Sequence, residues 1–189
     1  MLYLLFQPLI ALVLSFSSGP ELPDRTHVIV WDENRLLLYN DFKSDSGPKG
    51  SEAALAVVGM EYSASMSLRK YEVSIVTMFD TRKSWFSKEM FGNEYILKHE
   101  QGHFDLAEIH SRRLRKAITE SNFRNKDVFN KVSAMYKEAN RKLHQDQLRY
   151  DRETHHSVKP EEQKLWEEKI SSELRSLEKF KDTLIVMKF

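Results

Sequence analysis

The feature that most restricts the fold is a long stretch of chain almost free of helix breakers. No proline occurs between Pro48 and Pro160, and Gly102 is the only glycine after Gly92. Proline interrupts helical hydrogen bonding and glycine costs about 1 kcal/mol in a helix interior, so their scarcity favours long helices. Apolar residues recur there at the spacing of one helix face. They are Ile96, Phe104, Ala107, Leu114 and Ile118. The stretch therefore predicts a long first helix beginning after residue 87.

Two further helices are expected toward the C-terminus. Apolar residues return at helical spacing over residues 126–152 and again over residues 160–180. Pro160 suits the first turn of a helix, where no amide hydrogen is needed. The carboxylates of Glu161 and Glu162 suit the positive end of the same helix dipole.

The chain before residue 87 has the composition of strands. Five runs are rich in β-branched and aromatic residues or alternate apolar with polar side chains. They are residues 27–31, 36–39, 53–60, 62–68 and 71–79, of which the last alternates most clearly. Residues 53–56 can equally start a helix, and residues 184–189 can form a last strand.

Strands followed by helices predict the α+β class. We expect an N-terminal antiparallel β-sheet followed by three long α-helices, with residues 20–86 mainly β and residues 87–181 mainly α. The length suits a single domain over residues 20–189.

The first 19 residues carry no charged side chain and end in Ser17, Ser18 and Gly19. An apolar segment followed by small residues predicts a secretory signal peptide over residues 1–19. A short membrane anchor and a buried N-terminal helix are the alternatives, although the run is shorter than the roughly 20 residues of a spanning helix. We therefore expect a secreted or periplasmic protein without a membrane span after cleavage. Since the chain has no cysteine, it cannot be a lipoprotein anchored through a leader cysteine.

Charge and cysteine content exclude several function classes. The formal net charge is +1, which argues against a nucleic-acid binder that depends on releasing counterions. The absence of cysteine excludes disulfides, a thiol nucleophile and cysteine metal ligands. A metal site in this chain must therefore use histidine and carboxylate.

One motif within the first predicted helix carries chemistry. Residues 99–103 read HEQGH, so His99 and His103 are four apart with Glu100 beside the first. On a helix, residues four apart are separated by about 40° around the axis and about 6 Å along it. Two imidazoles so placed can bind one Zn²⁺, and Glu100 can take the proton of a zinc-bound water as the general base. Gly102 in this helix suggests that another element packs closely against it.

A catalytic zinc usually has a third protein ligand. The candidates lie where the second helix ends, because a helix end can bring a side chain over the first helix. They are Asp151, Glu153, His155 and His156, and their spacing alone does not choose among them. His110 lies about 10.5 Å along the first helix from His103 and is too far away.

The sequence resembles a bacterial family of secreted proteins of unknown function, described as predicted zinc-dependent proteases. The resemblance rests on residues 97–110 (LKHEQGHFDLAEIH) with the basic stretch at 112–115, and on residues 150–156 (YDRETHH). The second block of the family reads Tyr-Asp-x-x-Thr-x-His-Gly, and Ser157 stands here in place of the glycine. The resemblance implies a zinc-dependent protease in which the family histidine, His156, is the third ligand.

These observations together predict a secreted, zincin-like metallopeptidase that acts on a peptide or protein substrate. His99, His103 and His156 would hold Zn²⁺ and Glu100 would act as the general base, with Tyr150 bonding to the oxyanion. Asp105 is two residues from His103 and so points to another helix face, which favours a structural role. By analogy with zincins, residues 71–79 could be an edge strand that binds the peptide. The alternatives are a non-catalytic secreted zinc-binding module and a helical partner-binding protein.

Overall fold

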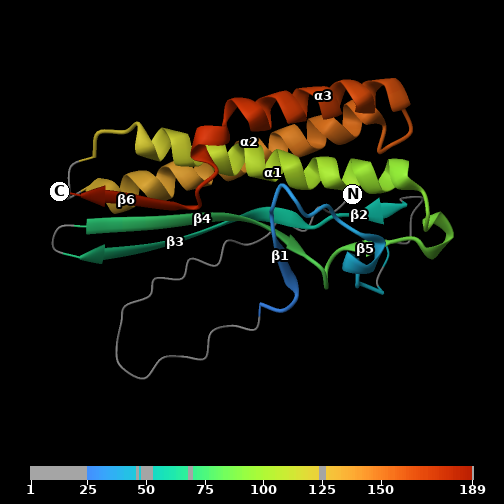
Figure 1. The fold of residues 1–189 in the computed structure, drawn as a ribbon, viewed down its shortest axis with the longest axis horizontal. Helices are drawn as coiled ribbons and strands as arrows, with labels where there is room; N and C mark the ends of the chain where they lie inside the picture. Colours follow the sequence, from blue (N-terminus) through green and yellow to red (C-terminus); the bar gives the residue numbers. More distant parts are fainter. Residues whose placement is uncertain (1–24, 46, 48–52, 68–69, 124–126, 189) are drawn as a thin grey trace.

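The computed structural model describes residues 25–45, 47, 53–67, 70–123 and 127–188. An antiparallel sheet forms one layer, and three helices cover one of its faces (Figure 1). The helices are α1 (Glu94–Thr119), α2 (Val128–Thr154) and α3 (Pro160–Ser176). This mixed architecture confirms the expected antiparallel sheet and three long helices. Helix α1 contacts the sheet, α2 and α3, and it is therefore the central element of the fold.

Strand β4 (Lys70–Asp80) is the centre of the sheet. It pairs along its whole length with β3 (Val58–Ser67). Its other edge is shared by β1 (Val28–Val30) at one end and β6 (Leu184–Lys188) at the other. The expected last strand is thus confirmed. The expectation that residues 71–79 form a peptide-binding edge strand is wrong, because neighbouring strands pair with both edges of β4.

The segment around residues 36–39 is not the strand that its apolar run predicts. The backbone N–H of Leu37 donates to the Gln101 side chain at 2.8 Å, and that of Leu38 donates to Asp41 at 2.8 Å. These amides bond to side chains, so they do not join a strand ladder. A short 3₁₀ helix, η1 (Tyr39–Asp41), follows instead.

Residues 53–60 divide between two sheets and do not start a helix. Strand β2 (Ala54–Leu55) pairs with β5 (Trp85–Phe86), a short strand that the sequence did not suggest. Two more 3₁₀ turns, η2 (Lys88–Met90) and η4 (Glu178–Phe180), precede α1 and follow α3.

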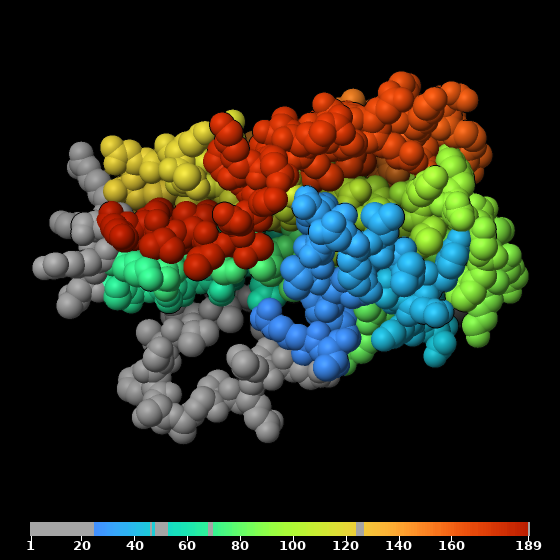
Figure 2. All heavy atoms as spheres, viewed as in Figure 1, coloured from blue at the N-terminus to red at the C-terminus, as the bar shows by residue number. Residues whose placement is uncertain are grey.

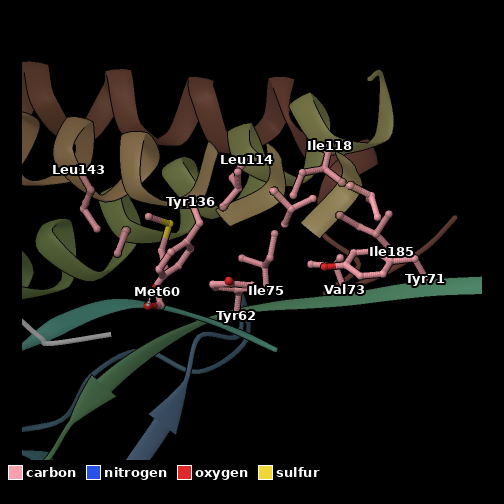
Figure 3. Packing of buried hydrophobic residues seen from close by; sticks show 13 residues of the cluster. Met60, Tyr62, Tyr71, Val73, Ile75, Leu114, Ile118, Tyr136, Leu143 and Ile185 are labelled. Carbon is pink, nitrogen blue, oxygen red and sulfur yellow. Dashed lines mark hydrogen bonds between the residues drawn. The ribbon is translucent and has the colours of Figure 1, made fainter. Parts of the chain in front are cut away.

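The main hydrophobic core lies between the sheet and helices α1 and α2 (Figure 3). Tyr62, Val73 and Ile75 point from the strands toward Leu114 and Tyr136 on the helices. The Tyr136 hydroxyl also donates to the backbone oxygen of Met60 at 2.6 Å. A separate cluster packs α3 onto α1 and α2 through Trp166. Helix α2 is thereby held against both the sheet and α3.

A buried ionic network fixes the C-terminal segment to α1. The Glu108 carboxylate accepts hydrogen bonds from Arg112 and Arg115, and all three side chains are almost fully buried. Arg115 also donates to the backbone oxygens of Phe180 and Lys181. Figure 2 shows the C-terminal segment (red) running across the front of the molecule from the helical layer to the strand residues coloured green. Two arginines of the basic stretch at 112–115 therefore have a structural role, because they join α1 to the C-terminal segment.

Within the described part of the chain, no helix has the length and apolar character needed to cross a membrane. The predicted signal peptide, residues 1–19, lies outside the described residues. The expectation of a single domain over residues 20–189 stays a prediction.

Candidate metal centre

The two histidines of the HEQGH motif lie on α1, in its second and third turns. Asn93 begins this helix, because its side chain accepts hydrogen bonds from the backbone N–H groups of Tyr95 and Ile96. His99 and His103 face the same side, and their Nε2 atoms are 3.2 Å apart. The predicted helical setting of the motif is thus confirmed.

Asp151, on the last turns of α2, supplies a third donor atom. Its Oδ1 lies 3.2 Å from His99 Nε2 and 2.9 Å from His103 Nε2. Of the four candidates near the end of α2, only Asp151 joins the histidines in a group whose ligand atoms all lie within 4.8 Å of one another. The group is largely buried, since Asp151 is 5 % exposed and His99 3 % exposed.

These three atoms can hold a metal ion. Tetrahedral bonds of about 2.0–2.1 Å place neighbouring ligand atoms about 3.3 Å apart, and the measured separations of 2.9–3.2 Å agree. The oxygen and two nitrogens form a nearly equilateral triangle with sides of 3.2, 2.9 and 3.2 Å.

The predicted third ligand, His156, lies next to this group and outside it. Its Nδ1 is 3.6 Å from Asp151 Oδ1, and its side chain is 50 % exposed. His155 is exposed, and Glu153 accepts hydrogen bonds from Arg149 and Trp166. His156 therefore lies on the solvent side of the group, where it contacts the Asp151 carboxylate.

Gly102 allows α2 to approach α1 at this point. A Cβ atom added to Gly102 would lie 2.5 Å from the Tyr150 hydroxyl and 2.9 Å from its ring carbon Cζ. The fully buried Tyr150 ring also stacks on the His99 ring, with centroids 4.5 Å apart. Since Asp151 follows Tyr150 directly, the close approach at Gly102 also sets the position of the third donor. The predicted close packing against Gly102 is confirmed. The Tyr150 hydroxyl, which was expected to bond to an oxyanion, faces α1 and is buried there.

We expect Gly102→Ala to destabilise the fold. Alanine would gain about 1 kcal/mol of helix propensity, but overpacking against Tyr150 typically costs about 1–3 kcal/mol and should outweigh it. Tyr150→Phe removes the closest atom and should recover part of the loss in the double variant. Denaturant unfolding of the two single variants and the double variant measures this coupling. A Gly102→Ala protein more stable than wild type would contradict the close approach.

Glu100 lies on the sheet side of the histidine pair. Its Oε2 accepts a hydrogen bond of 2.6 Å from the backbone N–H of Ala56, just after β2. The side chain is buried, and this burial raises the pKa of Glu100 to about 7. A carboxyl group with this pKa exchanges protons near neutral pH, as a general base must.

The two histidines titrate differently. Burial lowers the pKa of His99 to about 4. Burial alone would also lower the pKa of His103, but the Asp151 carboxylate, together with Glu100 and the hydrogen bond to Gln147, outweighs burial and raises that pKa to about 9. The carboxylate thus favours a positive charge at this point, carried either by a protonated His103 or by a metal cation.

The chain after α2 makes a left-handed turn. His155, His156 and Ser157 have φ angles of 49°, 52° and 66°, and they are the only non-glycine residues with positive φ in the described ranges. The turn is held at its base by Thr154, whose carbonyl oxygen accepts from the N–H groups of Val158 and Lys159. It brings His156 back over Asp151. Such a conformation costs about 1–2 kcal/mol for each L-residue, and such strained positions cluster at functional sites.

We expect Ser157→Gly to stabilise the protein by about 0.5–1 kcal/mol. Glycine adopts positive φ without the steric cost of a Cβ, although its greater freedom in the unfolded chain offsets part of the gain. The midpoint of denaturant unfolding with a chelator present measures the change. Ser157→Ala keeps the Cβ and should show no gain, so equal stabilities of the two variants would argue against strain in the turn.

Several polar contacts made by the motif and its neighbours could not be predicted from the sequence. Gln101 accepts from Leu37 N–H and donates to Asp105, whose carboxylate also accepts from the Trp31 ring N–H. Asp105 therefore anchors the segment after β1, as its predicted structural role requires. Gln147 of α2 bonds to His103. A glutamine inside a charged helix gives no sequence signal for such a role.

A family model described as a bacterial protein of unknown function, DUF922, matches residues 20–157, which include the HEQGH motif, Asp151 and His156. No curated protein and no solved structure gives a match. The match confirms the resemblance to a bacterial family of unknown function, and the proteolysis that the resemblance implies stays a prediction. The matched range covers most of the chain, and this protein therefore belongs to the DUF922 family.

Proposed function

We propose that this protein is a zinc-dependent hydrolase of peptide bonds, with the metal held by His99, His103 and Asp151. The observation that carries the proposal is the triangle of two imidazole nitrogens and one carboxylate oxygen, 2.9–3.2 Å apart, with a buried carboxylate on the adjacent residue Glu100. Two histidines and one carboxylate are a known donor set of catalytic zinc, with a fourth position for water.

The chemistry divides between the metal and the chain. His99, His103 and Asp151 would hold the zinc ion, which would supply Lewis-acid chemistry by making a bound water more acidic and by polarising a carbonyl group. Glu100 supplies the base that takes the proton of the water and later gives it to the leaving amine. The Ala56 N–H holds Oε2 of that carboxylate at 2.6 Å, and Oε1 would be the oxygen that takes the proton.

His156 has a different place in this proposal from the one that the family resemblance implies. It lies on the solvent side of Asp151, with its Nδ1 3.6 Å from the carboxylate. Three protein ligands leave a fourth position for chemistry, whereas a fourth protein ligand would close the site. Whether His156 binds the metal therefore separates a catalytic from a structural zinc centre.

The test combines metal analysis with a cleavage assay. The purified chain, loaded with zinc or stripped with a chelator, is incubated with a peptide library whose products are identified by mass spectrometry. We expect one equivalent of zinc and cleavage only by the loaded protein, restored when zinc is returned. Bound zinc without cleavage would favour a non-catalytic zinc-binding module, and absence of metal binding would favour a helical partner-binding protein.

We also propose that the protein is exported, with the signal peptide at residues 1–19 removed. The uncharged apolar leader supports this proposal. Cell fractionation and N-terminal sequencing of the mature protein test it. A protein that keeps its first residue and stays inside the cell would contradict export.

A further inference from the structure

The Gln147 side chain makes two hydrogen bonds to a single residue, His103. Its Nε2 donates to the backbone oxygen of His103 at 2.9 Å, and its Oε1 bonds to His103 Nδ1. Gln147 lies on α2 one turn before Asp151, on the face that packs against α1. Both hydrogen bonds thus cross the interface between α2 and α1.

The backbone oxygen of His103 fixes the orientation of this amide. A carbonyl oxygen can only accept a hydrogen bond, so the Gln147 atom that faces it must be the NH₂ group. The amide is planar, and its oxygen must then face the ring nitrogen Nδ1. The assignment of nitrogen and oxygen in this side chain therefore follows from the bonding partners.

The amide in turn fixes the histidine. An amide oxygen cannot donate, so Nδ1 of His103 must carry the hydrogen that joins them. In the neutral ring, Nε2 is then the nitrogen with the free lone pair, and Nε2 is the atom that faces Asp151 and His99. We infer that Gln147 is a positioning residue that holds His103 in the tautomer and ring orientation required of a metal ligand. The inference rests on the metal site of the proposed function.

The other histidine of the pair is held by different means. His99 Nδ1 is buried and has no hydrogen-bond partner within the described part of the chain. The His99 ring instead stacks on Tyr150 with an angle of 16° between the planes. Stacking fixes the plane of a ring but does not choose between its two tautomers. Of the two imidazoles, only that of His103 therefore has a hydrogen bond at Nδ1 within the described part of the chain, whereas His99 contacts Asp151 through Nε2.

Two variants of Gln147 separate the tautomer from simple helix packing. Gln147→Met keeps the length of the side chain and removes both bonds, whereas Gln147→Glu keeps an acceptor for His103 Nδ1 and removes the donor. Gln145→Met is the matched control, because Gln145 is exposed on the same helix. Zinc affinity is measured by competition with a chromogenic chelator, and cobalt absorption spectra report the coordination.

We expect Gln147→Met to bind zinc about 10–100-fold more weakly, as for other residues that orient metal ligands. Gln147→Glu should recover most of this loss, and Gln145→Met should match wild type. Equal weakening in both Gln147 variants, or wild-type affinity in Gln147→Met, would overturn the inference.

Nitrogen-15 spectra of histidine test the tautomer without metal. In the stripped protein, at a pH at which the spectra show the His103 ring to be neutral, the bonded hydrogen should lie on Nδ1 in wild type and shift toward Nε2 in Gln147→Met. The same mixture of tautomers in both proteins would refute the inference. Failure of wild type to bind zinc would refute the proposed function instead, while this spectrum would still decide the role of Gln147.

Discussion

Replacing Glu100 with glutamine is expected to abolish peptide cleavage and to leave zinc binding intact. The Glu100 carboxylate is the only group in the proposed mechanism that accepts the proton of the water. Loss of a general base typically lowers the rate about 10²–10⁴-fold. The amide oxygen of glutamine can still accept from Ala56 N–H, so the local contact with β2 is kept. The measurement is the initial rate on a peptide cleaved by wild type, with zinc content determined on the same samples.

Glu94→Gln is the matched control, since Glu94 lies on the same helix and is exposed. It should keep both wild-type activity and zinc. A Glu100→Gln protein that cleaves at the wild-type rate would show that another group is the base. A Glu100→Gln protein without zinc would show that the carboxylate stabilises the metal centre itself.

Replacing Asp151 with alanine is expected to weaken zinc binding by more than about 100-fold, beyond the range typical of residues that only support ligands. Asp151 supplies one of three donor atoms and the only negative charge among them. Two neutral imidazoles would remain, and their attraction for a cation is much weaker. Zinc affinity from chelator competition and the cobalt spectrum measure the effect, with the unfolding midpoint of the stripped protein to show that the fold is intact.

His156→Ala tests the other candidate for the third ligand. Because His156 lies outside the group of three, its removal should weaken zinc binding less than about tenfold and leave the cobalt spectrum unchanged. The opposite ranking, with His156→Ala losing zinc and Asp151→Ala keeping it, would make His156 the ligand that the family resemblance implies. Equal and complete losses would indicate four protein ligands and a closed, structural site.

The helical half of the fold was predictable because helix signals are local. The apolar positions from Ile96 to Ile118 repeat with the period of a helix, and Pro160 stands at the first residue of α3. The order of the strands was not predictable in the same way. Pairing of β6 with β4 joins residues far apart in the sequence, and no local pattern encodes such a contact. The apolar run at residues 36–39 does not form a strand, because the amide of Leu37 bonds to Gln101, which is distant in the sequence, and that of Leu38 bonds to Asp41, three residues further on.

The amino-acid sequence was enough to predict the pair of histidines with Glu100 beside the first of them, because the period of the α-helix places residues four apart on one side. The burial of Glu100 emerged only from the fold. Gly102 in the sequence also indicated that another element must pack at this turn. The sequence did not show which element packs against Gly102, nor which of its side chains lies near His99 and His103, because both depend on the tertiary structure. Tyr150 packs against Gly102, and this contact brings Asp151 to the histidines, whereas the left-handed turn leaves His156 beside Asp151 and half exposed. Helix periodicity depends on the local backbone, but the meeting of His99 with Asp151 depends on the packing of two helices, since these residues are 52 apart in the sequence.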